Sequence, residues 1–170
     1  EEIATATERL EALVFGVADY GASLRMPSHG ASGHGEDDPD YPGHKWHYPL
    51  SRLIMAARAA GLQAVDAPYG DYRDREGLER SCRMSAALGY DGKWAVHPDQ
   101  IDIVNRVYTP DESEYERCKR ILEAFERARS RGEGAISLDG EMVDAASVRV
   151  AREVCAKWER IRERWGSSTD

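Results

Sequence analysis

The chain has 170 residues, and 41% of them are hydrophobic, so it is long enough to bury a core as a single domain. A net charge of −8 argues against nucleic-acid binding, which needs a clustered surplus of lysine and arginine. No apolar run approaches the ~20 residues of a membrane span, and Glu1 and Glu2 are unlike the basic start of a signal peptide. The three cysteines, Cys82, Cys118 and Cys155, lie too far apart to indicate a disulfide framework or a zinc knuckle. We therefore expect a soluble cytoplasmic protein that binds neither nucleic acid nor membrane.

Alternating strand and helix patterns fill most of the first 110 residues. Residues 1–12 look like the end of a helix. Apolar, β-rich runs predict strands over residues 13–16, 62–68 and 92–97. Amphipathic spacing predicts helices over residues 49–61, 74–89 and 98–110, with Gly61 and Gly89 as C-terminal caps. Three strand-then-helix units in a row predict an α/β fold with a parallel sheet.

A long excursion over residues 25–48 is rich in glycine, proline, histidine and aspartate and has no apolar period. Its histidines, His29, His34, His44 and His47, raise a zinc hypothesis. Their spacing matches no closed structural zinc site and no cysteine accompanies them, so solvated loop histidines are the favoured interpretation.

The character of the chain changes after Pro110. Residues 111–132 predict a long charged amphipathic helix that Asp111 or Ser113 could cap. Residues 134–144 predict a hairpin with Asp139 and Gly140 as the turn pair, and a last helix and a frayed tail follow.

Polar residues follow each predicted strand, at the ends where ligands gather in α/β folds. The first cluster is Gly16 to Asp19, because a glycine lets the backbone approach a ligand and Asp19 offers a hard oxygen ligand. Its structural alternative is a helix cap or a turn. For the second cluster, residues 66–74, turn chemistry is the favoured interpretation. The third cluster is residues 97–100, and for its His97 a structural role is favoured. Asp144 is interpreted from the pattern alone as a helix N-cap.

Several long segments occur in the order found in the aldolase/citrate lyase superfamily and cover most of the chain. They are LVFGVADY, AGLQAVDAPYGDYRDREGL, ALGYDGKWAVHPDQIDIVNRVYTP and ISLDGEMVD. The chain is most similar to the malyl-CoA lyases of this superfamily, the L-malyl-CoA/β-methylmalyl-CoA lyase kind. The resemblance implies the C-terminal half of a (β/α)8 TIM barrel. Residues 1–110 would then hold strands six to eight, and residues 111–170 would be an extension reaching a neighbouring subunit.

The resemblance also implies site residues. Asp19 would be a carboxylate ligand of magnesium, and Gly16, Val17 and Ala18 would be the backbone that receives the glyoxylate carboxylate. Asp144, brought by an adjacent subunit, would be the catalytic acid/base at the α-carbon of the acyl-CoA.

The thioester pocket would include residues 66–69, here Asp66, Pro68 and Tyr69, with Ala67 in place of the family's usual glycine. A second metal ligand, a glutamate, and a substrate-binding arginine would belong to an N-terminal half that lies outside this chain.

The implied activity is reversible cleavage of a 3-hydroxyacyl-CoA, such as malyl-CoA or β-methylmalyl-CoA, to glyoxylate and acetyl- or propionyl-CoA. The expected cofactor is Mg²⁺, with Mn²⁺ as an alternative, and coenzyme A is part of the substrate. The expected assembly is a homo-oligomer, a trimer or a hexamer. Alternatives are a malyl-CoA thioesterase or malate-synthase-like activity, a citryl- or citramalyl-CoA lyase of the citrate lyase β-subunit kind, and a non-catalytic partner subunit.

Overall fold

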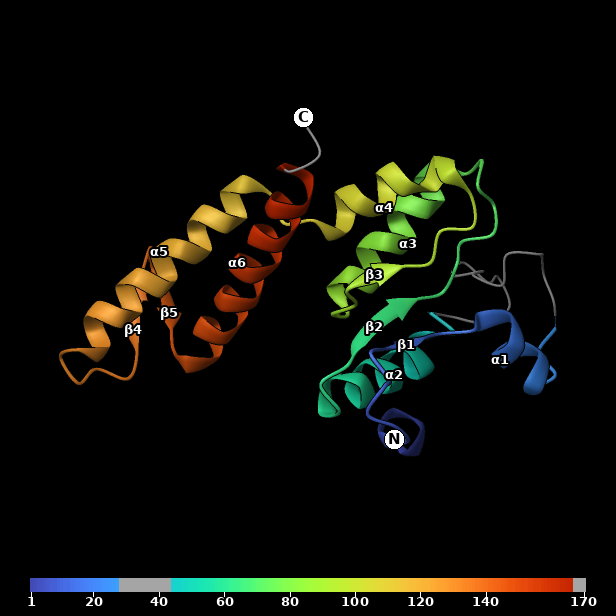
Figure 1. The fold of residues 1–170 in the computed structure, drawn as a ribbon, viewed down its shortest axis with the longest axis horizontal. Coiled ribbons are helices and arrows are strands. Elements are labelled where there is room, and N and C mark those ends of the chain that lie inside the picture. The colour runs from blue at the N-terminus through green and yellow to red at the C-terminus, as the bar shows by residue number, and fades with distance from the viewer. Residues whose placement is uncertain (28–43, 167–170) are drawn as a thin grey trace. The chain divides into compact units, whose positions relative to one another are not determined.

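The computed structural model describes residues 1–27 and 44–166, with side chains up to residue 164. The chain divides into two compact units, Glu1–Tyr108 and Thr109–Asp170 (Figure 1). Each unit has its own cluster of buried hydrophobic side chains.

A three-stranded parallel sheet organises the first unit. Its strands are β1 (Ala12–Val14), β2 (Gln63–Asp66) and β3 (Gly92–Lys93), in the spatial order β1-β2-β3. In the described part of this unit, four α-helices and two short 3-10 turns connect and flank the strands: η1 (Glu2–Thr5), α1 (Val17–Ser23), α2 (His47–Ala59), α3 (Arg75–Ala87), η2 (Pro98–Gln100) and α4 (Ile101–Tyr108). The predicted α/β class and the parallel strand pairing are confirmed.

Two glycines end helices as the sequence predicts. Gly61 follows α2 with φ of 70°, and Gly89 follows α3 with φ of 99°. Only glycine adopts this left-handed backbone without steric strain, so both helices stop there and the chain turns back into the next strand.

The core of the first unit lies between the sheet and its helices. Leu50 from α2, Leu78 and Cys82 from α3 and Ala64 from β2 are almost completely buried. The hydroxyl of Tyr90 donates to the carbonyl of Leu50 over 2.9 Å, so the one polar atom of this buried ring has a partner.

Two predicted elements are much shorter than the sequence pattern indicates. The expected helix end over residues 1–12 is only the 3-10 turn Glu2–Thr5, and the strand over 92–97 is only Gly92–Lys93. Trp94 and Val96, which continue the apolar run, are 56% and 51% exposed. Within the described residues no strand pairs with the outer edge of β3, so the extended pattern has no partner there.

The second unit is a pair of long helices and a hairpin. Helices α5 (Glu112–Arg129) and α6 (Ala145–Gly166) pack on each other, and β4 (Ile136–Leu138) pairs with β5 (Glu141–Val143) in antiparallel register. The predicted turn pair is confirmed, since Asp139 and Gly140 have φ of 53° and 84°, which is typical of a two-residue type I′ hairpin turn. Of the two candidate caps of α5, Asp111 is the one that accepts a hydrogen bond from the helix, from the Glu114 N–H over 2.8 Å.

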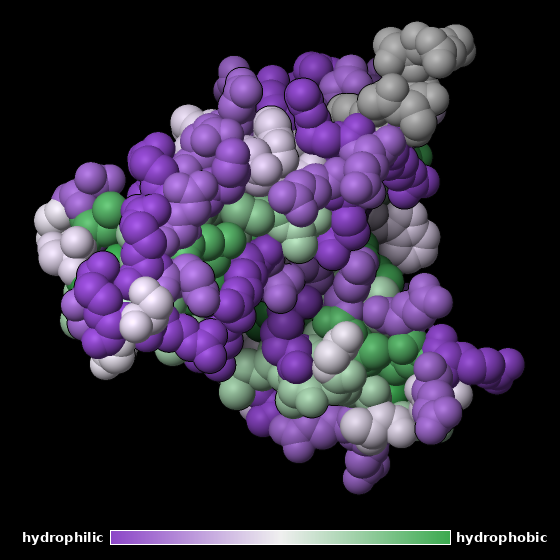
Figure 2. Space-filling model, turned by 60° about the vertical axis from the view of Figure 1, so that its left-hand side comes forward, coloured by the Kyte–Doolittle hydropathy of each residue, from purple (hydrophilic) through white to green (hydrophobic). Residues whose placement is uncertain are grey.

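Hydrophilic side chains cover most of the face shown in Figure 2, with hydrophobic side chains visible between them. None of the described helices is long and apolar enough to cross a membrane.

Candidate active site

The carboxyl ends of the three parallel strands meet at one edge of the sheet, where ligands usually bind in α/β folds. The chain leaves these ends through residues 16–19 after β1, residues 67–74 after β2 and residues 94–100 after β3. These segments and Asp66, the last residue of β2, contain all the predicted site residues of the first unit.

Asp19 lies in the first turn of α1, and its side chain is exposed. A Cβ atom added at Gly16, the N-cap, would lie 3.3 Å from Asp19 Oδ2, so the carboxylate folds back over the glycine. Val17 is only 3% exposed and anchors the start of the helix in the core. The N–H groups of this first turn have no carbonyl partner within the helix. An exposed carboxylate and unbonded N–H groups therefore share one short turn.

The residues present fit a divalent cation in part. Asp19 supplies the hard oxygen ligand that such a cation prefers. Among the residues that the structure describes, no three His, Cys, Asp or Glu side chains lie together so that they could hold a metal ion. This applies to His44 and His47 of the zinc hypothesis, whereas His29 and His34 lie outside the described residues. The remaining ligands of a metal at Asp19 would have to come from outside the described chain.

Asp66, at the end of β2, is fully buried and its carboxylate is fully engaged. Its Oδ2 lies 2.6 Å from the Nζ of Lys93, and its Oδ1 accepts a hydrogen bond of 2.7 Å from the N–H of Ala67. A substrate at this strand end would therefore meet the backbone and the half-buried side chains of Pro68 and Tyr69 rather than the Asp66 carboxylate. The substrate-binding role of these residues stays a prediction.

Tyr69 is held by the start of α3. Its hydroxyl donates to Asp74 Oδ2 over 2.7 Å, and Asp74 Oδ1 accepts from the Gly77 N–H over 2.9 Å as the N-cap of the helix. The Tyr69 hydroxyl and the Gly77 N–H hold the pKa of Asp74 below its usual range. The carboxylate of Asp74 therefore fixes the position of the Tyr69 ring.

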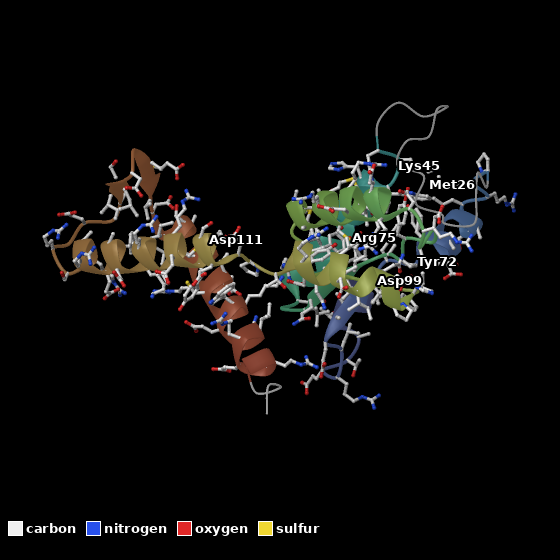
Figure 3. All side chains as sticks on the ribbon, turned by 90° about the horizontal axis from the view of Figure 1, so that it is seen from above. Met26, Lys45, Tyr72, Arg75, Asp99 and Asp111 are labelled. Atoms are coloured by element: carbon white, nitrogen blue, oxygen red, sulfur yellow. The ribbon has the colours of Figure 1, made fainter. Side chains whose placement is uncertain are left out.

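His97 caps the 3-10 turn η2 and packs against Tyr72. Its Nδ1 accepts a hydrogen bond from the Asp99 N–H over 3.2 Å, and its ring stacks on Tyr72 with centroids 4.3 Å apart. Arg75 reaches the Asp99 carbonyl over 3.3 Å (Figure 3). These contacts support the interpretation of His97 as a cap and packing residue.

Asp144 lies in the second unit as the N-cap of α6. Its Oδ1 accepts from the N–H groups of Ala146 and Ser147 over 2.9 and 3.0 Å. The same two N–H groups, Ser147 first, lower the pKa of the Asp144 carboxyl. The cap predicted from the pattern is confirmed, and the acid/base role implied by the resemblance stays a prediction, because Asp19 belongs to the other unit.

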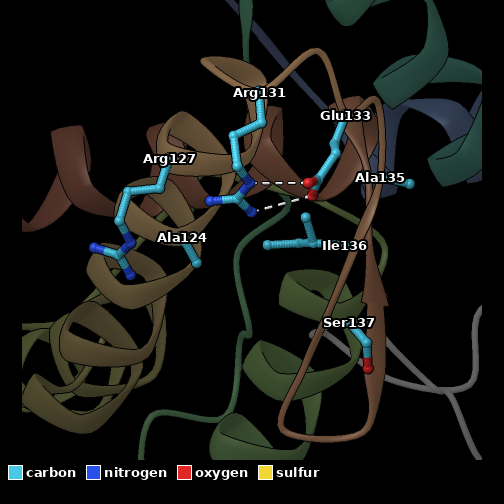
Figure 4. Close-up of a pocket in the computed structure, with 7 residues that line it drawn as sticks. All are labelled: Ala124, Arg127, Arg131, Glu133, Ala135, Ile136 and Ser137. Carbon is cyan, nitrogen blue, oxygen red and sulfur yellow. Dashed lines mark hydrogen bonds and ion pairs between the residues drawn. The ribbon is translucent and has the colours of Figure 1, made fainter.

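The second unit also has an open hollow of about 480 Å³ between the end of α5 and β4. Figure 4 shows its lining: Ala124, Arg127, Arg131, Glu133, Ala135, Ile136 and Ser137. Arg131 and Glu133 form a two-bond ion pair of 2.9 and 3.1 Å across it. None of the predicted site residues lines this hollow.

Three polar residues lie buried beneath the strand ends: Ser81 and Lys93, which belong to none of the three predicted clusters, and Gln100, the last residue of the third. Lys93 and Ser81 contact each other over 2.9 Å, and Gln100 donates to the carbonyl of Tyr69 over 2.7 Å. The only signal for Lys93 was a lysine inside an apolar strand pattern, where a charge needs a buried partner.

The fold is that of an α/β protein, and its candidate ligand site lies at the carboxyl ends of the parallel strands. A family model described as HpcH/HpaI aldolase/citrate lyase matches residues 1–98. The chain belongs to the HpcH/HpaI aldolase/citrate lyase family, which confirms the resemblance found in its sequence.

Three relatives show the extent of the match. The L-malyl-CoA/beta-methylmalyl-CoA lyase of Cereibacter sphaeroides is 38% identical over 167 residues, covering 95% of this chain and 52% of the relative. The (3S)-malyl-CoA thioesterase of the same species is 40% identical over 112 residues, covering 66% of this chain and 39% of the relative. The crystal structure of CitE from Mycobacterium tuberculosis in complex with magnesium, acetoacetate and coenzyme A matches with a TM-score of 0.65 and 30% identity, covering 86% of this chain and 51% of that one. The chain thus spans about half the length of the lyase that it matches.

Proposed function

We propose that this chain forms the C-terminal half of a magnesium-dependent lyase that cleaves a 3-hydroxyacyl-CoA into glyoxylate and an acyl-CoA. Malyl-CoA and β-methylmalyl-CoA are the proposed substrates, and acetyl- and propionyl-CoA the second products. The observation that carries the proposal is the exposed Asp19 carboxylate in the turn after β1, in a chain 38% identical to a malyl-CoA lyase.

The proposed architecture is a (β/α)8 barrel in which residues 1–110 supply strands six to eight. The parallel order β1-β2-β3 supports it, because consecutive strands of such a barrel are neighbours. The exposed apolar residues Trp94 and Val96, beyond the short β3, would then be covered by the other half. Residues 111–170 would be the extension that reaches a neighbouring subunit of a homo-oligomer.

Asp19 is the proposed carboxylate ligand of the metal. A bound Mg²⁺ would supply Lewis-acid polarisation of the substrate oxygen that changes between alkoxide and carbonyl. The N–H groups of Val17 and Ala18, unbonded within the helix, would receive the glyoxylate carboxylate next to Gly16. Residues 66–69 would line the thioester pocket.

Asp144 is the proposed acid/base at the α-carbon. The N–H groups that lower the pKa of Asp144 favour its ionised form. The ionised form is the one that removes the α-proton of the acyl-CoA when glyoxylate and acyl-CoA condense. In the cleavage direction the 3-hydroxyl group gives its proton to water, the C–C bond breaks and its electron pair forms the enolate. The enolate then takes a proton from the Asp144 carboxyl group, which this direction requires in its protonated form and which water reprotonates afterwards.

The three cysteines are free thiols buried in the two cores, which supports a reducing cytoplasm as the compartment.

The direct test is a cleavage assay on the assembled enzyme with malyl-CoA and Mg²⁺. Asp19→Ala is expected to lower magnesium-dependent activity by more than ~100-fold. Substitution of residues that only hydrogen-bond to a metal ligand already lowers metal affinity or activity by about 10- to 100-fold, and loss of the ligand itself should have a larger effect. Calorimetric titration with Mg²⁺ should show the same loss of binding. Asp102→Ala is the matched control, because Asp102 is also an exposed carboxylate in the first turn of an α-helix. Full magnesium binding by the Asp19→Ala protein would contradict the proposed site.

A second prediction concerns the proton transfer. Asp144→Asn is expected to keep glyoxylate binding but to stop exchange of the α-protons of acetyl-CoA in deuterated water, because an amide cannot remove a proton. Asparagine caps helices as well as aspartate, so α6 should stay folded. Asp111→Asn, at the capping aspartate of α5, is the matched control and should exchange normally. Normal exchange in the Asp144→Asn enzyme would rule out this role.

Thioester hydrolysis is the second candidate function, favoured by the 40% identity to a malyl-CoA thioesterase over part of the chain. Product analysis separates the two reactions. Glyoxylate with acetyl-CoA indicates cleavage, whereas malate with free coenzyme A indicates hydrolysis.

A further inference from the structure

A lysine is buried beneath the strand ends with no exposed side-chain surface. The Nζ of Lys93, on β3, lies 2.6 Å from Asp66 Oδ2 on β2 and 2.9 Å from Ser81 Oγ on α3. The side chains of Lys93 and Asp66 are both 0% exposed. Lysine is almost never fully buried unless it is paired, so three elements of the first unit converge on this one cation. Because no surface of the amine is accessible, it cannot act as a nucleophile on a substrate.

The carboxylate of Asp66 connects this cation to the backbone that leaves the sheet. Its Oδ2 contacts Lys93, while its Oδ1 accepts the N–H of Ala67 over 2.7 Å. The carbonyl of Asp66 in turn accepts the N–H of Trp94 over 3.0 Å. Lys93 therefore fixes the Asp66 rotamer, and that rotamer fixes the direction in which residues 67–69 leave β2.

Gln100 holds the other end of the same segment. Its Nε2 donates to the carbonyl of Tyr69 over 2.7 Å, and its Oε1 accepts the N–H groups of Val96 and His97 over 2.8 and 3.2 Å. Gln100 is 0% exposed. Residues 67–69 are thus held from both sides by fully buried polar side chains, an arrangement that rigidifies a backbone when all its polar groups are satisfied.

We propose that Lys93 is a positioning residue that acts through Asp66 to set the backbone of residues 67–69. The proposal rests on the proposed function, which puts this segment at the thioester pocket. A buried ion pair contributes little net stability compared with a well-packed apolar pair of the same volume. The proposed effect of the pair is on orientation: the contact between Lys93 and Asp66 Oδ2 turns Asp66 Oδ1 toward the N–H of Ala67.

The test substitutes both residues of the Lys93–Asp66 pair, because substituting only one of them would leave the other charge buried without a partner. Lys93→Met alone leaves the Asp66 charge buried without its cation, so that variant is expected to fold poorly. The double variant Lys93→Met with Asp66→Leu removes both charges, fills the space with apolar groups and should fold. Arg58→Met with Asp91→Leu is the matched control, because this ion pair joins the amino ends of β2 and β3, away from the strand-end segments.

Two measurements on the assembled enzyme are expected to change in the Lys93/Asp66 double variant only. Hydrogen exchange of the backbone N–H groups in residues 67–70 should rise at least about tenfold, while exchange in β1 and α2 stays unchanged. The kcat/KM for the acyl-CoA should fall by roughly 10- to 100-fold, since small misplacements of positioning groups have effects of this size. Magnesium and glyoxylate affinities, which the proposal assigns to residues 16–19, should stay at the parent values.

Exchange and kcat/KM both at parent values in the folded double variant would overturn the proposal. Faster exchange with an unchanged kcat/KM would contradict the location of this segment at the thioester, and with it that part of the proposed function. It would leave the effect of the Lys93–Asp66 pair on the backbone supported. The exchange measurement needs no substrate, so the two failures are distinguishable.

Discussion

An ion pair stabilises each end of the parallel sheet, and the two pairs differ in their exposure to solvent. At the amino ends, Arg58 forms a two-bond pair with Asp91 at 2.9 Å and also donates to the carbonyls of Leu62 and Gly89. The side chains of Arg58 and Asp91 are 46% and 32% exposed. At the carboxyl ends, the Lys93–Asp66 pair has no exposed surface.

This difference shows where the first unit needs directional precision. Water screens the Arg58–Asp91 pair, so its charges can separate without a large penalty, and it contacts none of the predicted site residues. The buried pair at the other end cannot be hydrated, so breaking it must rearrange the backbone around it. In (β/α)8 barrels, the architecture proposed for this chain, the carboxyl face contains the catalytic residues and the opposite face contributes to stability.

Among substitutions at the two ends of the sheet, Gly77→Ala, at the carboxyl end, is expected to reduce the free energy of unfolding most. A Cβ at residue 77 would lie 2.1 Å from the Tyr69 hydroxyl and 2.2 Å from Asp74 Oδ2, so it would clash with both side chains and displace them. Loss of the Asp74 cap and crowding should lower the free energy of unfolding by about 2 kcal/mol, despite the better helix propensity of alanine. Chemical denaturation would measure this loss, and the displaced Tyr69 should raise the KM for acyl-CoA.

Gly134→Ala is the matched control for that substitution. No heavy atom lies within 4 Å of a Cβ at residue 134, and its φ is not positive, so alanine should be tolerated within ~0.5 kcal/mol. Equal stability of the Gly77→Ala and Gly134→Ala proteins would show that the start of α3 is looser than described.

A smaller effect is expected from Arg58→Met at the amino end. Its ion pair is partly exposed, so the substitution should destabilise the protein by ~1 kcal/mol or less and leave kcat and KM unchanged. Thermal unfolding at low and high salt would check it, because salt should narrow the gap to the parent protein. A changed KM in this variant would contradict the proposal that the carboxyl end of the sheet affects substrate binding and that the amino end affects stability alone.

The sequence predicted elements well where local chemistry decides them. The glycine caps at Gly61 and Gly89, the Asp139–Gly140 turn and the caps at Asp111 and Asp144 all follow from backbone preferences of single residues. The predicted strand over 92–97 failed beyond Lys93, because a strand needs a partner and the described chain offers none at that edge. The roles proposed for Asp19 and Asp144 came from the family resemblance and not from the local pattern, since an aspartate after a strand or before a helix is also an ordinary cap.

By itself, the sequence determined the α/β class, the family and the residues that follow each strand. Periodicity and turn chemistry depend on neighbouring residues, and the order of the family motifs can be read directly along the chain. Only the tertiary structure showed that Asp66 is closed off by Lys93 and that Gln100 holds the carbonyl of Tyr69. These contacts join residues 27 and 31 positions apart in the chain. No local pattern specifies which buried polar groups meet across a sheet, because that is set by strand register and helix packing.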